Sequence, residues 1–283
     1  MRTRVQFPAE GNRCRVRMLT AAFAVLLLAC AAAAWPEGPS SSDSAGTTVA
    51  AWSIVHGRIQ PDAAVSVAPS KQKVYALVEA YVVNALPPDA RALVSRLELF
   101  VSTSTAQDAT DGTATENDDG TTWTVALDAQ EGESALVGGK LADRAVFDEV
   151  VAHEVGHVIS LNESQRADDD QEAGYSDQGD RFTMSAYLSR FYVRFWKNHY
   201  PRGSSRDDVD RAGARYDEDP QSFVTDYAAT DPSEDFAESF AYFVLDPAPT
   251  GTSVKDLKIQ FFYHFPDLVR DRDYLRKGLS SAN

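Results

Sequence analysis

The sequence predicts a mixed α+β fold, in which a small sheet comes first and long helices follow. Three observations support this class. Segments with strand-type alternation lie in the first half of the chain, helical apolar patterns dominate the second half, and no internal repeat is visible. With 43% hydrophobic residues among 283, the chain is able to bury a core of domain size.

The first 29 residues have the composition of an export signal. Arginines precede an apolar run, residues 18 to 29, that is too short to span a bilayer with ease. The run ends in Leu27-Leu28-Ala29-Cys30, which resembles a bacterial lipobox, so that Cys30 would carry a lipid. Cleavage among the alanines at 32 to 34 is the alternative. We therefore expect an exported protein, either a lipoprotein of the cell envelope or a secreted one.

Charge and cysteine content narrow the expected partners. The net charge is −15, and removal of the arginine-rich leader makes the chain more acidic still, which argues against nucleic acid. The other cysteine, Cys14, lies inside the leader, so the exported part should contain no internal disulfide. We expect a monomer that acts on a peptide or protein and touches a membrane only through a lipid at Cys30.

Residues 30 to 51 are rich in Ser, Gly, Ala and Pro and predict a flexible linker before a folded domain at residues 52 to 283. Strands are predicted at residues 52 to 55, 64 to 67, 97 to 102 and 123 to 127. Residues 71 to 86 predict an amphipathic helix, residues 88 to 96 a short helical turn, and the acidic stretch 108 to 120 a surface loop. The helix should bury Val74, Leu77, Val78, Tyr81, Val82 and Ala85.

The second half predicts helices at residues 141 to 161, 184 to 200, 231 to 245, 253 to 263 and 266 to 279. The polar stretches 162 to 181 and 202 to 220 predict connecting loops. In the helix 184 to 200 an aromatic stripe is expected to belong to the core and not to a substrate platform; it consists of Tyr187, Phe191, Phe195 and Trp196.

The helix at 141 to 161 contains His153-Glu154-Val155-Gly156-His157, an H-E-x-x-H pattern. Residues four apart share one helix face, so His153 and His157 are able to bind one metal ion. Glu154 is rotated by about 100° from His153, which suits a general base that faces a metal-activated water. The alternative, two histidines with ordinary hydrogen-bond partners, is disfavoured because the flanking residues are apolar and buried imidazoles without partners are costly. The pattern is typical of a zinc hydrolase.

A catalytic zinc usually has a third protein ligand. The third histidine of the metzincin pattern is absent, because Ser160 and Glu163 stand where that pattern has glycine and histidine. Three further histidines lie in no recognisable metal pattern: His56, His199 and His264.

Glu234 and Glu238 are the remaining candidates, on a helix that begins with Asp231 as N-cap. They are four residues apart and share one face, so one is able to bind the metal while the other orients a histidine. Their ordinary roles would be a capping box with Asp231 for Glu234 and a solvated face for Glu238. The neighbouring Phe236 buries the adjacent side, which disfavours an unpartnered carboxylate there.

The H-E-x-x-H segment and residues 227 to 240 together resemble the catalytic domain of the anthrax lethal factor family of gluzincin-type zinc peptidases. The resemblance implies a zincin-like domain with one Zn²⁺ per chain, in which Glu234 is the third ligand, Glu238 lies behind the ligands and Tyr227 assists catalysis. Residues 52 to 140 show no match and we expect no toxin-delivery domain, so the substrate of that family is not carried over.

Two functions remain open. In the first, an exported zinc metalloendopeptidase hydrolyses peptide bonds with Glu154 as general base, and Tyr227 stabilises the oxyanion. In the second, a catalytically inactive zincin-fold protein of the cell envelope binds a partner and keeps a structural zinc. The presence of Glu154 favours the first, because a structural zinc needs no general base. A peptidoglycan amidase explains the helix no better.

Overall fold

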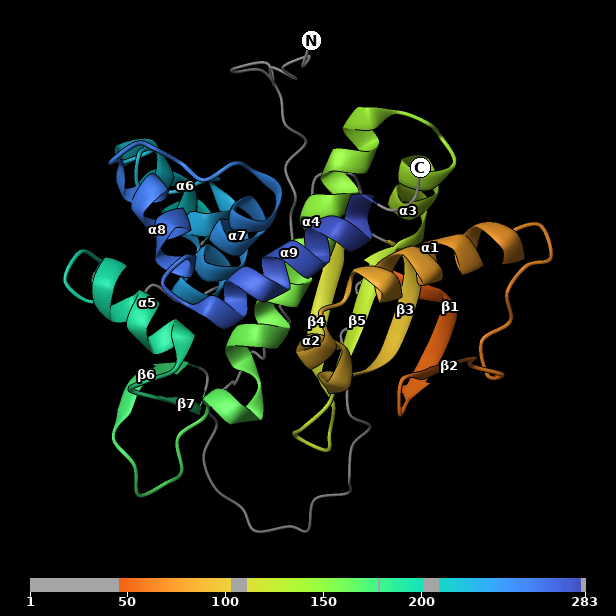
Figure 1. Ribbon diagram of the computed structural model, residues 1–283, viewed down its shortest axis with the longest axis horizontal. Helices are drawn as coiled ribbons and strands as arrows, with labels where there is room; N and C mark the ends of the chain where they lie inside the picture. The colour runs from red at the N-terminus through yellow and green to blue at the C-terminus, as the bar shows by residue number, and fades with distance from the viewer. Residues whose placement is uncertain (1–45, 103–110, 178, 201–208, 281–283) are drawn as a thin grey trace, which may run out of the picture.

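The computed structural model describes residues 46–102, 111–177, 179–200 and 209–280, and these form an α+β fold (Figure 1). The first half of the chain builds a twisted sheet on one side of the molecule, and most helices of the second half gather on the other side. The long helix α4 (Leu141–Leu161) lies between the two parts, as Figure 1 shows. The predicted α+β class is therefore confirmed.

The strands of the main sheet lie in the order β2-β1-β3-β5-β4. Their bounds are β1 Gly46–Val55, β2 Arg58–Pro61, β3 Val94–Ser102, β4 Gly112–Glu116 and β5 Trp123–Asp128. β3 and β5 are parallel and the other neighbours antiparallel. The turn between β1 and β2 has His56 and Gly57 at φ of 49° and 73°, as expected for a two-residue hairpin turn with positive φ at both positions.

Several predictions for the first half are wrong in detail. β1 begins at Gly46, so residues 46 to 51 belong to the sheet and not to the linker. Residues 64 to 67 form no strand, because the Asp62 carboxylate accepts the Ala64 N–H at 2.9 Å and turns the chain. The expected loop at 108 to 120 contains β4, which pairs with β5. Residues 129 to 136 form an unexpected helix, α3 (Ala129–Leu136), capped by Asp128.

The remaining helices are α1 Gln72–Ala85, α2 Pro88–Leu93, α5 Tyr187–Phe195, α6 Val209–Glu218, α7 Pro232–Leu245, α8 Val254–Phe262 and α9 Pro266–Ser280. Single 3-10 turns lie at η1 (Glu163–Gln165) and η2 (Tyr227–Ala229). The predicted loop 162 to 181 instead contains the start of a hairpin of β6 (Ala173–Asp177) and β7 (Asp180–Thr183), and the predicted loop 202 to 220 contains α6.

The core is continuous from the sheet to the helices. Most of the positions predicted for α1 are buried, but Leu77 is 43% exposed. The aromatic stripe of α5 is largely core, as predicted: the ring of Phe191 makes an edge contact with that of Phe236 on α7, at 5.5 Å between centroids. α4 and α7 pack closely at Gly156, where a Cβ would lie 3.1 Å from the Cα of Ala237.

Within the described residues, no helix has both the length and the apolar character that crossing a bilayer requires. The predicted export signal at residues 1 to 29, and Cys30 with it, lie outside the described residues.

Candidate metal centre

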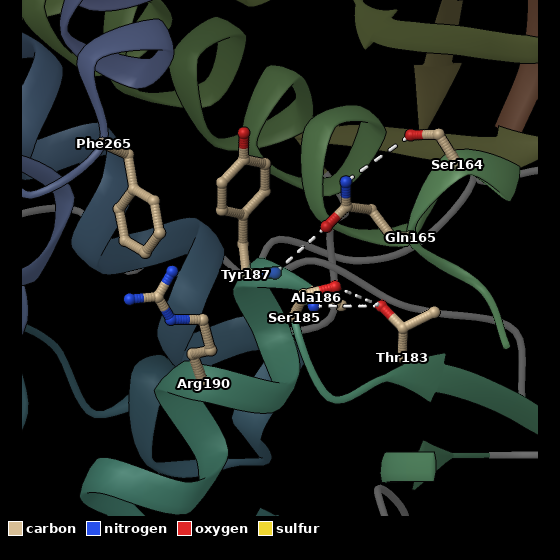
Figure 2. Close-up of a pocket in the computed structure, with 8 residues that line it drawn as sticks. All are labelled: Ser164, Gln165, Thr183, Ser185, Ala186, Tyr187, Arg190 and Phe265. Atoms are coloured by element: carbon tan, nitrogen blue, oxygen red, sulfur yellow. Dashed lines mark hydrogen bonds between the residues drawn. The ribbon is translucent and has the colours of Figure 1, made fainter. Parts of the chain in front are cut away.

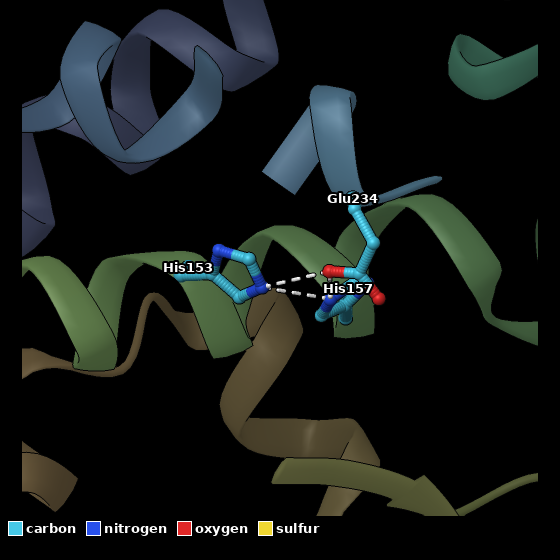
Figure 3. A group of neighbouring side chains, drawn as sticks. All are labelled: His153, His157 and Glu234. Carbon is cyan, nitrogen blue, oxygen red and sulfur yellow. Dashed lines mark hydrogen bonds and ion pairs between the residues drawn. The ribbon is translucent and has the colours of Figure 1, made fainter. Parts of the chain in front are cut away.

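Two helices bring three donor atoms to one point (Figure 3). His153 and His157 lie one turn apart on α4, and Glu234 lies in the first turn of α7. The two Nε2 atoms are 2.9 Å apart, and Glu234 Oε2 lies 3.3 Å from His153 Nε2 and 3.2 Å from His157 Nε2. The side chains are at most 5% exposed. These residues form a buried group that could hold a metal ion.

The position of the proton on His153 leaves a lone pair directed at the centre of the group, as a bound cation requires. His153 Nδ1 lies 2.7 Å from Glu238 Oε1, and because a carboxylate only accepts, Nδ1 carries the proton. In the neutral ring the lone pair is then on Nε2, which faces His157 Nε2 and Glu234 Oε2. Zinc bonds of usual length at tetrahedral angles would separate the ligand atoms by roughly 3.3–3.5 Å. The observed separations of 2.9 to 3.3 Å are close to these values.

The electrostatics of the group also favour a positive charge. Burial opposes a charge on His153, but hydrogen bonds to Glu234 and Glu238 outweigh it and hold the pKa of His153 well above its usual range. Burial would likewise raise the pKa of Glu234, but the neighbouring His157 and His153 lower it below its usual value. The carboxylate is therefore ionised, and the centre stabilises a proton or a metal ion between its donors.

Glu154 lies beside this group but is not one of its three donor residues. Burial raises the pKa of Glu154 to about 7, with the two histidines acting against this shift. Among the described residues, neither of its buried carboxylate oxygens has a hydrogen-bond partner. The edge strand β4 packs on it, since a Cβ at Gly112 would lie 2.9 Å from Glu154 Oε1. The side chain is therefore held in place by packing, and among the described residues its carboxylate oxygens make no hydrogen bond that would compete with a water molecule.

Tyr227 is half-buried on η2, and its ring centroid lies 6.1 Å from that of His153. Burial and the nearby carboxylates, Glu234 foremost, hold the pKa of Tyr227 well above its usual range, so the phenol keeps its proton. A protonated phenol next to the donor group is able to donate a hydrogen bond.

Glu234 does not form a capping box and Glu238 does not lie on a solvated face, the two ordinary roles that the sequence allowed. Asp231 caps α7 by accepting the N–H groups of Ser233 and Glu234 at 2.8 and 3.1 Å, but the Glu234 carboxylate faces the histidines and forms no capping box. Glu238 is 1% exposed and therefore not on a solvated face; Thr225 Oγ1 donates to its Oε2 at 2.6 Å. The three histidines set aside earlier are all exposed and lie outside the donor group: His56, His199 and His264.

Two residues that contact the site, Gly112 and Thr225, were not predicted from the sequence. Gly112 lies in a segment expected to be a loop, although the alternation Thr113-Ala114-Thr115 is a weak strand signal. Thr225 carries one local signal, because a threonine hydroxyl often caps an N–H group a few residues later. Its contact with Glu238 is a tertiary contact and has no sequence signal.

A separate hollow of about 160 Å³ lies at the start of α5, and none of the donor residues lines it (Figure 2). Its polar lining groups largely satisfy one another. Gln165 Oε1 accepts the Tyr187 N–H at 3.0 Å, and the Thr183 and Ser185 hydroxyl oxygens are 3.2 Å apart. The donor group is thus a centre of its own, in the contact between α4 and α7.

No protein-family model matches the sequence, and no curated protein matches it. Among solved structures, the chain is similar to the crystal structure of a "putative zinc-binding metallo-peptidase" from Bacteroides caccae, at 17% identity, with 73% of this chain and 74% of that chain covered and a TM-score of 0.40. A similarity at this level establishes neither a shared fold nor a shared activity. The description of the site therefore depends on the geometry of its own residues.

Proposed function

We propose that this protein is an exported zinc-dependent metallopeptidase that hydrolyses peptide bonds. The observation that carries the proposal is the convergence of three buried donor atoms from α4 and α7, with Glu154 beside them. His153, His157 and Glu234 would hold one zinc ion, which is the ligand set of the gluzincin type. When bound there, zinc supplies a Lewis acid that polarises a carbonyl and lowers the pKa of water toward about 7.

The surrounding side chains have roles that follow from their contacts. Glu238 accepts a hydrogen bond from the Nδ1–H of His153 and so keeps the lone pair of Nε2 directed at the centre. Glu154 lies beside the donor group with both carboxylate oxygens unpaired among the described residues, so it is able to take a proton from the attacking water and pass it to the leaving amine. Tyr227 keeps its proton and donates a hydrogen bond to the oxygen on which negative charge develops.

The alternative is a binding protein of the cell envelope with a structural zinc and no turnover. It differs from the proposal in the catalytic residues, because it gives neither Glu154 nor Tyr227 a chemical role. Burying a carboxylate without a hydrogen-bond partner is costly, and a structural centre would gain nothing from that cost. The proposed export, either as a lipoprotein with a lipid at Cys30 or as a secreted protein, is supported by the leader sequence alone.

The test uses the purified protein and two glutamine variants. Glu154→Gln removes the general base, and Glu163→Gln makes the same chemical change at an exposed position just beyond α4. We expect the wild type and both variants to bind one zinc ion per chain, measured by metal analysis after dialysis. Cleavage of a diverse peptide pool should be sensitive to chelators and should fall at least about 100-fold in Glu154→Gln alone.

Two results would contradict the proposal. Bound zinc with no cleavage of any peptide by the wild type would favour the binding protein. A wild type that binds no zinc would refute the metal centre itself, and with it both functions.

A further inference from the structure

Thr225 precedes η2, and its hydroxyl makes two hydrogen bonds that connect different parts of the centre. Thr225 Oγ1 donates to Glu238 Oε2 at 2.6 Å and accepts the N–H of Ala228 at 3.0 Å. A hydroxyl has one proton and two lone pairs, so both bonds form at once. Their directions are fixed, because a carboxylate only accepts and a backbone N–H only donates.

The first bond acts on the ligand His153. The Glu238 carboxylate is 1% exposed, and its two oxygens have different partners: Oε1 lies 2.7 Å from His153 Nδ1, and Oε2 accepts from Thr225. With both oxygens bound, the carboxylate plane cannot rotate without breaking a buried hydrogen bond, which is costly. Thr225 therefore holds the acceptor that fixes the ring and the tautomer of His153.

The second bond acts on Tyr227. Ala228 lies in η2, so the N–H that Thr225 accepts belongs to the turn that presents the phenol. The far end of this turn is held separately, because Arg215 donates to the carbonyls of Ala229 and Thr230. Arg215 fixes where the turn lies, and Thr225 connects the turn to the carboxylate behind the donor group.

We propose that Thr225 is a positioning residue of the metal centre, which sets the orientation of Glu238 and the place of the Tyr227 turn together through one hydroxyl. This inference rests on the proposed function, since it concerns the same site. It adds a residue outside both motifs, and it makes the orientation of His153 depend on the segment that carries Tyr227.

The test compares three variants by zinc affinity, measured by chelator competition on the purified protein. Thr225→Val keeps the shape of the side chain and removes the hydroxyl, whereas Thr225→Ser keeps the hydroxyl. Thr183→Val is the matched control, because Thr183 Oγ1 accepts the Ala186 N–H at 3.1 Å in a similar turn, drawn in Figure 2, away from the donor group. If the loss of a capping hydroxyl lowered zinc affinity only by destabilising the fold in general, Thr225→Val and Thr183→Val would both lower it.

We expect Thr225→Val to bind zinc roughly tenfold more weakly than the wild type, at the lower end of the loss seen when partners of metal ligands are removed. Thr225→Ser and Thr183→Val should both stay within about threefold of the wild type, the first because its hydroxyl is retained and the second because it is remote. A double variant with Glu238→Gln tests the route. If Thr225 acts through Glu238, adding Thr225→Val to Glu238→Gln weakens binding by clearly less than tenfold.

The outcomes separate this inference from the proposed function. Wild-type zinc affinity in Thr225→Val, or equal losses in Thr225→Val and Thr225→Ser, would overturn the role of Thr225 and leave the metallopeptidase proposal intact. A wild type that binds no zinc would overturn both. Should Thr225→Val not fold, Thr225→Ala is measured in its place against the same thresholds.

Discussion

The substitution Lys258→Met tests how the first turn of α7 is held. Lys258 Nζ on α8 lies 2.5 Å from Asp235 Oδ2 on α7, and neither side chain has any exposed area. Trp196 Nε1 donates to the same oxygen at 2.7 Å, and Nζ also donates to the Ser222 carbonyl at 2.6 Å. Methionine retains the aliphatic stem and removes the charge, so the variant leaves Asp235 without its cation.

The expected loss follows from the burial of the pair. Removing one partner of a buried ion pair costs about 3–5 kcal/mol, because the other charge stays desolvated. Burial raises the pKa of Asp235 to about 6 even though Lys258 lowers it, so without Lys258 it must rise further. Above about pH 6, folded Lys258→Met retains a proton that the folded wild type has lost. Its stability relative to the wild type therefore falls as the pH rises, by up to about 1.4 kcal/mol per unit.

The assay is urea unfolding at pH 5 and pH 8 in the presence of a chelator, so that metal binding at Glu234 does not contribute. The double variant Asp235→Asn with Lys258→Met is the control, and it should recover most of the loss because no charge remains buried. A loss below about 1 kcal/mol at pH 8, or the same loss at both pH values, would contradict the account of a desolvated carboxylate.

Three further predictions concern other parts of the chain. Burial and nearby Asp111 raise the pKa of Glu131 from 4.5 to about 8, so the stability of the native protein should fall as the pH rises through this range. In thermal unfolding, Glu131→Gln should therefore raise the Tm by several degrees at pH 9 and hardly change it at pH 4. Gly112→Ala places a Cβ 2.9 Å from Glu154 Oε1 and so displaces this carboxylate. Kinetics should show cleavage at least about tenfold slower, while metal analysis should show that zinc is retained. Free zinc at 100 times its Kd should stabilise the protein by about 2.7 kcal/mol in urea unfolding, and Glu234→Ala should abolish this shift.

The two helices of the centre could be predicted from the sequence because their signals are local. α4 has the bounds that its apolar pattern predicted, and it is buried nearly all round over its second half. α7 begins after Asp231 with proline at its first position, and the Asp231 side chain accepts the N–H groups of Ser233 and Glu234. A cap and a periodic apolar pattern depend on neighbours in sequence, so they can be read without a structure.

The strand β4, which was expected to be part of a loop, is short and polar and depends on a distant partner. β4 becomes a strand because it pairs with β5, with Ala114 opposite Val125, while its own sequence carries only a weak strand signal. In the same way, the contact between Thr225 and Glu238 joins two elements whose relative position is a property of the whole fold. Propensity decides little for such segments, because tertiary contacts override it.

The approach of α4 to α7 explains why a glycine, Gly156, lies inside the helix that carries the histidines. A Cβ at position 156 would lie 3.1 Å from the Cα of Ala237, a distance that a real side chain reaches only if its neighbours move. Ala237 lies on α7 between Glu234, which faces both histidines, and Glu238, which faces His153. A wider helix spacing would therefore move both carboxylates away from the imidazoles. The roughly 1 kcal/mol that a glycine costs inside a helix is offset by a contact that sets the distances between the donor atoms.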